Sequence, residues 1–192
     1  MRVKICGITR VSDAQHAEAC GAYAIGVVMY SDSDRSVSMD RAREIFASLQ
    51  PSTLKVAVTH STSENDMRKI LSLHPDAVQI SYPFSFPKTR AIKVFRVITR
   101  EDYRVSRDDT DFIVVDESRG SGREFNPDFA CKTVRQSPVP VVLAGGLTPE
   151  NVRSAIERVK PAIVDVASGV ESMPGIKDSE KVREFLACCR DL

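Results

Sequence analysis

Residues 141–152 read VVLAGGLTPENV, and this stretch contains one complete structural unit. The four apolar residues 141–144 predict a short strand that is buried on both faces. The glycine pair 145–146 predicts a turn, and Thr148 followed by Pro149 predicts a helix N-cap with proline at the first helical position. A strand that runs directly into a helix is the repeating unit of a parallel α/β fold, so the architecture depends on how often it recurs.

Near-continuous apolar segments of four to six residues recur along the whole chain. The predicted strands are Val3–Cys6, Ala24–Val28, Leu54–Val58, Ala77–Ile80, Ile92–Val97, Phe112–Val115, Val141–Ala144 and Ile163–Val166. Helix patterns lie between them, with start signals at Ser12 followed by Gln15, at Ser63 and at Thr99, and with a last helix over Asp178–Cys189. The chain therefore alternates strands with helices from end to end.

This alternation predicts an α/β fold, a single (β/α)8 TIM barrel over residues 1–192. Eight units in 192 residues average about 24 residues each, which fits a barrel at the short end of its size range. The segment SYPFSFPKT (81–89) contains two prolines and predicts a degenerate helix after strand four. A doubly wound open sheet is disfavoured because no G-x-G-x-x-G fingerprint follows the first strand.

Composition excludes several classes of protein. The net charge is +1, so the charge balance predicts no nucleic-acid partner. No apolar run approaches the ~18 residues that a membrane helix needs, and a strand pattern begins at once within residues 1–9, so we expect a cytoplasmic protein. Five cysteines without regular spacing indicate reduced thiols. The three histidines are scattered along the chain and form no metal-ligand pattern, so we expect no metal site.

The first strand ends in KICGIT (4–9). Side chains alternate along a strand, so Lys4 and Cys6 should point into the barrel while Val3 and Ile5 face the helices. A neighbouring ammonium favours the thiolate, so we expect Lys4 to lower the pKa of Cys6. Cys6 is then a candidate base or nucleophile, and the alternative of a plain core cysteine remains open with roughly equal weight.

Other polar residues terminate later strands, where barrel enzymes place their active sites. Asp116 ends strand six before a glycine-containing loop and is a candidate general acid. The turns after strands seven and eight predict a phosphate cradle because they offer backbone N–H groups and a hydroxyl. The residues of this predicted cradle are Gly145, Gly146, Ser168 and Gly169.

Three further residues are candidates for substrate binding. Asp165 should face inward from strand eight and meet a polar ligand or a lysine, and Gln79 near the end of strand four could bind substrate hydroxyls. Arg35 follows strand two and could hold a carboxylate in a bidentate arrangement. A solvated loop arginine is the alternative interpretation of Arg35.

The motifs KICGIT (4–9), VDESRGSG (115–122), LAGGLTPENV (143–152) and VDVASGVESMPGIKD (164–178) resemble the phosphoribosylanthranilate isomerase family over nearly the whole chain. The resemblance implies a barrel that needs no metal or organic cofactor. It also implies a small-molecule substrate, N-(5-phosphoribosyl)anthranilate, which the enzyme converts by an Amadori rearrangement to 1-(2-carboxyphenylamino)-1-deoxyribulose 5-phosphate in tryptophan biosynthesis.

Site roles follow from the same resemblance. It implies that Cys6 is the general base, Asp116 the general acid, Arg35 the anchor of the anthranilate carboxylate and Asp165 a contact of the ribose end. The four cradle residues would bind the phosphate, and Lys4 would keep Cys6 ionised.

Some positions depart from the family pattern. QISY (79–82) stands where the family often has QLHG, so Ser81 replaces a histidine, and SDR (33–35) replaces SPR. After strand six, RGSG is followed by FNP (125–127) where GGTG and FDW are usual.

Other functions remain possible on the sequence alone. A metal-using sugar-phosphate epimerase would want more histidines, and a Schiff-base aldolase would use Lys4 as its nucleophile. A non-catalytic barrel that binds a phosphorylated metabolite would need neither Cys6 nor Asp116. Isomerisation of the related histidine-pathway aminoaldose would need two phosphate cradles, and one is visible. Monomer and homodimer are both compatible with the sequence.

Overall fold

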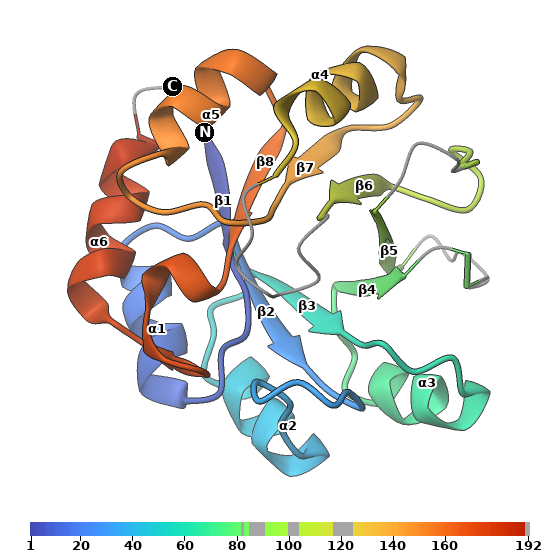
Figure 1. Ribbon diagram of the computed structural model, residues 1–192. Coiled ribbons are helices and arrows are strands. Elements are labelled where there is room, and N and C mark those ends of the chain that lie inside the picture. Colours follow the sequence, from blue (N-terminus) through green and yellow to red (C-terminus); the bar gives the residue numbers. More distant parts are fainter. Residues whose placement is uncertain (82, 85–90, 100–103, 117–124, 191–192) are drawn as a thin grey trace.

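The computed structural model describes all residues except 82, 85–90, 100–103, 117–124 and 191–192. Eight parallel strands form a closed barrel in sequence order, and β1 pairs with β8 to complete the ring (Figure 1). The strands are β1 (Arg2–Ile5), β2 (Ala24–Val28), β3 (Leu54–Val58), β4 (Ala77–Ser81), β5 (Lys93–Ile98), β6 (Phe112–Val115), β7 (Val141–Leu143) and β8 (Ile163–Val166). The predicted (β/α)8 barrel is confirmed, and each strand lies within one residue of its predicted bounds.

Helices surround the barrel in Figure 1. They are α1 (Val11–Ala19), α2 (Met39–Ala47), α3 (Glu64–Leu71), α4 (Pro127–Gln136), α5 (Val152–Val159) and α6 (Ser179–Cys188). The part of the chain that the structure describes has no helix between β4 and β5 or between β5 and β6. The degenerate helix predicted after strand four and the helix start predicted at Thr99 fall largely on residues 82, 85–90 and 100–103, outside the described residues.

Between β4 and β6, where the described residues form no helix, a buried arginine on β5 connects the neighbouring loops to the barrel. Arg96 lies on the outer face of β5 and is 2 % exposed. Its Nε donates a hydrogen bond to Thr110 Oγ1 at 2.9 Å, and its guanidinium also donates to the carbonyl oxygen of Phe84. A buried charge is tolerated only when its hydrogen bonds are satisfied, and these contacts satisfy part of that need.

Two predicted helix starts are confirmed and two are wrong. Ser63 caps α3 by accepting a hydrogen bond from the backbone of Asp66, and Asp178 caps α6 at its predicted start. Helix α1 begins before Ser12, which therefore lies inside the helix and caps nothing. Its hydroxyl contacts the neighbouring Asp13 carboxylate at 3.3 Å, so the predicted capping box with Gln15 does not form.

Helix α5 begins four residues after the predicted cap at Thr148. The reason is that the Asn151 side chain makes hydrogen bonds to the residues that precede it. The Asn151 side chain accepts a hydrogen bond from Thr148 N at 2.8 Å and donates one to Gly146 O at 2.9 Å. These two bonds fold residues 146–151 into a turn of their own. The asparagine thus fixes the glycine loop, and the helix starts only at Val152.

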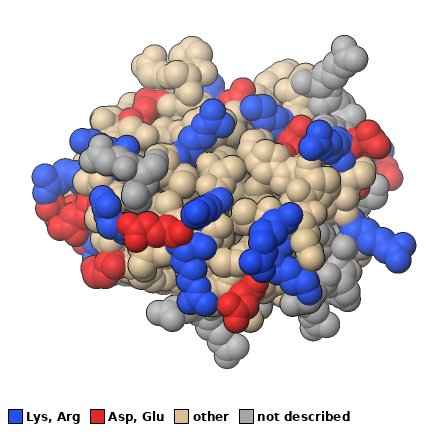
Figure 2. All heavy atoms as spheres, turned by 90° about the horizontal axis from the view of Figure 1, so that it is seen from above, with Lys and Arg blue, Asp and Glu red and all other residues tan. Residues whose placement is uncertain are grey.

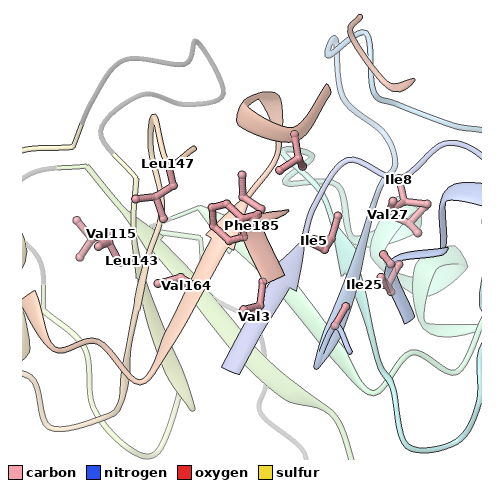
Figure 3. Close-up of a cluster of buried hydrophobic side chains, with 14 of the residues drawn as sticks. Val3, Ile5, Ile8, Ile25, Val27, Val115, Leu143, Leu147, Val164 and Phe185 are labelled. Atoms are coloured by element: carbon pink, nitrogen blue, oxygen red, sulfur yellow. The ribbon is translucent and has the colours of Figure 1, made fainter. Parts of the chain in front are cut away.

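The buried side chains separate into two layers, as the strand alternation requires. Val3 and Ile5 of β1 pack with Phe185 of α6 in the layer between strands and helices (Figure 3). Cys6 packs with a different set inside the barrel, which includes Phe95. Each fully buried aliphatic or aromatic side chain contributes roughly 1.5–3 kcal/mol, so both layers stabilise the barrel that carries the loops.

The sequence analysis did not foresee a small hairpin after β8. A single 3-10 turn (Ser168–Val170) leads into β9 (Glu171–Met173), which pairs antiparallel with β10 (Ile176–Lys177). The backbone N–H of Lys177 donates to Asp13 Oδ2 at 3.0 Å and ties the hairpin to α1. The hairpin therefore lies beside the loop that follows β1.

Charges of both signs are mixed on the surface. Figure 2 shows Lys and Arg side chains interspersed with Asp and Glu on the face that it presents. That face has no field of one sign such as polyanion binding would use.

Candidate active site

A cavity of about 1520 Å³ opens at the carboxyl ends of the barrel strands. Eight of the ten predicted site residues line it, drawn from strands and loops across the whole sequence: Cys6, Arg35, Gln79, Asp116, Gly145, Gly146, Asp165 and Ser168. The other two predicted site residues, Lys4 and Gly169, do not line the cavity. The fold thus brings together residues up to 162 positions apart in the chain. They meet at the carboxyl ends of the strands, as predicted.

Lys4 and Asp165 form an ion pair at the base of the cavity. They are register partners on β1 and β8, and Lys4 Nζ donates to Asp165 Oδ2 at 2.7 Å. Lys4 is fully buried. Burial disfavours its ammonium, but the negative charge of Asp165 and the hydrogen bond to it outweigh burial and raise the pKa of Lys4. Lys4 is therefore a charged, paired residue.

Lys4 lowers the pKa of Cys6 as predicted, but the net shift of that pKa is upward. Burial raises the pKa of the Cys6 thiol, Lys4 lowers it by less, and Asp165 raises it again. The largest influence is the burial of the thiol, which the strand alternation does not measure, and the Asp165 carboxylate offsets part of the influence of Lys4. Cys6 is thus a neutral thiol in this state of the site, and a further positive charge is needed to favour its thiolate.

Two glycines leave room for these groups. An added Cβ at Gly26 of β2 would lie 2.9 Å from Cys6 Sγ and 3.1 Å from Lys4 Cε. Gly7 has a φ of +70°, and an added Cβ there would lie 2.5 Å from Arg35 Cδ. The thiol, the ammonium and the arginine stem therefore fit only because glycine stands beside them.

Two buried oxygens in the site have no hydrogen-bond partner among the described residues. They are Gln79 Oε1 and Asp165 Oδ1, and both residues line the cavity. A buried acceptor without a donor costs free energy. These atoms are therefore positioned to accept hydrogen bonds from substrate hydroxyls.

Asp116 lies on the far side of the cavity from Cys6. It follows β6 directly, and its backbone N–H donates to Ile98 O at 3.2 Å. In the barrel order β1 and β6 are separated by β7 and β8, so the two residues approach the cavity from different directions. Most of the glycine-containing loop that follows Asp116 lies outside the described residues.

The glycine turns after β7 and β8 meet at one edge of the cavity. Gly145 and Gly146 have φ values of +95° and +64°, which side-chain-bearing residues rarely adopt. An added Cβ at Gly169 would lie 1.8 Å from Leu147 O, so the two loops touch there. Ser168 lines the same edge. The arrangement suits a phosphate group, and its role in binding one stays a prediction.

Arg35 lines the cavity, but it is not the free loop cation of the alternative interpretation. Its Nε and Nη2 donate to Glu171 Oε1 and Oε2 at 2.9 and 2.7 Å. Lys177 Nζ also donates to Glu171 Oε1, at 2.8 Å. Glu171 and Lys177 lie within the motif VDVASGVESMPGIKD (164–178), and neither was predicted to have a role. A signal was present, because Pro174 and Gly175 between them predict a tight turn that would bring an acid and a lysine face to face.

The described residues contain neither a metal-ligand cluster nor a helix that could span a membrane. No group of three or more His, Cys, Asp or Glu side chains in those ranges is arranged to hold a metal ion. Within the same ranges, no helix has both the length and the apolar character needed to cross a membrane.

The family model for N-(5'-phosphoribosyl)anthranilate isomerase matches residues 3–187. A relative of that name from Methanoregula boonei is 54% identical over 192 residues, covering 100% of this chain and 97% of that protein. The crystal structure of phosphoribosyl anthranilate isomerase from Thermus thermophilus has a TM-score of 0.86 and 32% identity, with 98% of each chain covered.

A further solved structure is a phosphoribosyl anthranilate isomerase in complex with reduced 1-(o-carboxyphenylamino)-1-deoxyribulose 5-phosphate. It has a TM-score of 0.81 and 31% identity over 100% of both chains. The matching family model, the shared fold and this degree of identity confirm the resemblance to the family. The chain belongs to the N-(5'-phosphoribosyl)anthranilate isomerase family.

Proposed function

We propose that the protein catalyses the Amadori rearrangement of N-(5'-phosphoribosyl)anthranilate in tryptophan biosynthesis. The observation that carries this proposal is one cavity that holds an acid and a thiol on different sides, a carboxylate-binding arginine and a glycine-rich edge. The substrate has the matching parts, namely a furanose ring, a phosphate and an aromatic carboxylate. We also propose that residues 1–192 act as one domain, since β1 and β8 pair directly.

In the first step Asp116 protonates the ring oxygen of the ribose. The C1–O bond breaks, and the nitrogen lone pair forms a C=N⁺ bond, which leaves Asp116 as a carboxylate. The new iminium ion is a cation inside a partly buried site. It therefore supplies the positive charge that Cys6 lacks in the empty site, so the Cys6 thiol releases its proton to solvent and the thiolate forms.

In the second step the Cys6 thiolate removes the proton from C2, which the adjacent iminium has made acidic. The electron pair moves into a C1=C2 enolamine, and this tautomerises to the ketone product. No electrons leave the substrate, so the reaction needs no redox cofactor. Each correctly placed acid or base contributes on the order of 10²–10⁴-fold to the rate.

Three residues would orient the substrate during these steps. The guanidinium of Arg35 meets the anthranilate carboxylate, while Asp165 Oδ1 and Gln79 Oε1 accept hydrogen bonds from hydroxyls of the sugar. The glycine turns after β7 and β8, together with Ser168, hold the phosphate, because backbone N–H groups are good donors to an anion. Binding at both ends fixes C1 and C2 between the acid and the thiol.

The structure disfavours the aldolase alternative. A Schiff-base lysine must be neutral and must reach the substrate. Lys4 is fully buried, does not line the cavity and is paired at 2.7 Å with Asp165. Its raised pKa keeps it charged, so it is a poor nucleophile.

We propose that the protein turns over its substrate as a monomer or as a homodimer. A biosynthetic reaction on a phosphorylated intermediate is consistent with a cytoplasmic enzyme. One of the similar solved structures is described as monomers generated from the dimeric enzyme of Thermotoga maritima.

Complementation tests this function in a cell. The gene should restore growth without tryptophan to a strain that lacks the isomerase, whereas Cys6→Ser and Asp116→Asn should not. Failure of the unaltered chain to support growth, although the protein is folded and expressed, would contradict the proposal.

A further inference from the structure

Glu171, the first residue of β9, is a buried carboxylate that belongs to no predicted role. Its side chain is 4 % exposed and does not line the cavity. It accepts two hydrogen bonds from Arg35, one from Lys177 Nζ at 2.8 Å and one from the backbone N–H of Gly175 at 3.3 Å. Such a set of donors stabilises an ionised carboxylate, and it holds the donors in place in return.

The geometry of Arg35 determines which of its N–H groups remain for a ligand. Glu171 occupies the side edge of the guanidinium, formed by Nε and Nη2. The end edge, formed by Nη1 and the second N–H of Nη2, has no hydrogen bond in the described part of the chain. Arg35 lines the cavity and is 15 % exposed, and its stem lies against Gly7, so its rotamers are few.

The net charge of the cluster around Glu171 indicates which kind of ligand group binds at the end edge of Arg35. Arg35 and Lys177 are two cations that share the single carboxylate of Glu171, so this cluster carries a net charge of +1. Burial lowers the pKa of Lys177, and the negative charge of Glu171 offsets part of that effect. A carboxylate at the Arg35 end edge would bring the cluster to two cations and two anions, which is the arrangement that a half-buried site stabilises.

We infer that Glu171 is a positioning and specificity-determining residue: it fixes Arg35 by its side edge so that the end edge selects substrates with a carboxylate on the aromatic ring. The inference rests on the proposed function, because it assigns that carboxylate to Arg35. Glu171 itself does not touch the substrate, so its effect should depend on the carboxylate and on nothing else in the ligand.

The test substitutes Glu171→Gln. Every group around Glu171 is a donor, and a glutamine offers one acceptor oxygen while its NH₂ would face a donor. Arg35 then loses its two-point contact and must be ordered again when the ligand binds. Ordering a flexible side chain corresponds to roughly a tenfold change in Kd. The matched control is Glu180→Gln, which removes an exposed carboxylate that pairs with Arg183 on α6.

Two stable probes separate the positioning role from a general loss of structure. The first is reduced 1-(o-carboxyphenylamino)-1-deoxyribulose 5-phosphate, and the second is the same compound without the carboxyl group. In Glu171→Gln, Kd should rise about tenfold for the first probe and stay within about twofold for the second. KM for the natural substrate should rise by a similar factor while kcat changes by less than about threefold. Glu180→Gln should leave all four quantities unchanged.

An equal loss of affinity for both probes, or unchanged affinity for the carboxylated one, would overturn the inference. If Glu171→Gln does not fold, Glu171→Asp keeps the charge but shortens the reach, and it should show the same selectivity to a smaller degree. Turnover by the unaltered protein is measured alongside. Its absence would contradict the proposed function, whereas normal turnover with no carboxylate-dependent effect in the variants would contradict only the role of Glu171.

Discussion

The substitution Gly26→Ala tests how tightly the barrel interior positions Cys6. The added methyl group would lie 2.9 Å from Cys6 Sγ, where ordinary contacts are 3.4–4 Å, and also 3.2 Å from Cys6 Cα. Rotation of the thiol alone cannot relieve the clash, because the Cys6 Cα is also closer than an ordinary contact. The end of β1 must therefore move by about 0.5–1 Å, and a misplacement of about 1 Å can cost a catalyst about 100-fold.

Overpacking also reduces stability, by about 1–3 kcal/mol, so the assay must separate lost positioning from lost folding. The control is Gly21→Ala, whose Cβ meets nothing within 4 Å but whose φ of +101° strains an alanine. That strain costs of the order of 1–3 kcal/mol without any contact with the site.

Both variants should show a lowered free energy of unfolding in denaturant titrations. Only Gly26→Ala should lose kcat/KM, by about 10–100-fold at 25 °C, where both remain folded. A folded Gly26→Ala protein with the kcat/KM of the unaltered chain would refute the claim that Gly26 sets the position of the thiol.

Three further predictions follow from the site. Because burial raises the pKa of Cys6, kcat/KM should still increase as pH passes 9.0, the ordinary thiol value, and a plateau well below 9.0 would contradict this. Lys4→Met leaves Asp165 buried without its partner and should lower the free energy of unfolding by about 3–5 kcal/mol in urea; a loss below about 1 kcal/mol would show that the pair is not buried as described. Asn151→Ala removes the hydrogen bond to Gly146 O and should raise KM about tenfold with kcat nearly unchanged. An unchanged KM would show that the turn at Gly146 does not contribute to phosphate binding.

Much of this fold was predictable because parallel strands are buried on both faces and therefore appear as continuous apolar runs. The alternation within β1 also placed Lys4 and Cys6 inside the barrel correctly. Helix starts were less predictable, because local signals compete with tertiary ones. Thr148 has the composition of an N-cap, but Asn151 makes hydrogen bonds that pull the preceding residues into a turn.

The electrostatics of the site were not predictable from strand positions alone. Lys4 and Asp165 are 161 residues apart and pair directly, and burial of the Cys6 thiol exceeds the influence of Lys4 on the pKa of Cys6. Arg35 and Glu171 are 136 residues apart, and they meet only because a hairpin after β8 returns toward the loop after β2. Pairwise contacts of this kind depend on register and loop path, which local sequence patterns do not encode.

The assignment of Cys6 as base and Asp116 as acid is tested most directly by turnover of N-(5'-phosphoribosyl)anthranilate by the purified protein. The unaltered chain should convert the substrate to the ribulose derivative, while folded Cys6→Ser and Asp116→Asn should each lose about 100-fold or more in kcat with modest changes in KM. Conversion by both variants within about threefold of the unaltered rate would contradict the acid–base assignment, and no conversion by the unaltered protein would contradict the proposed function itself.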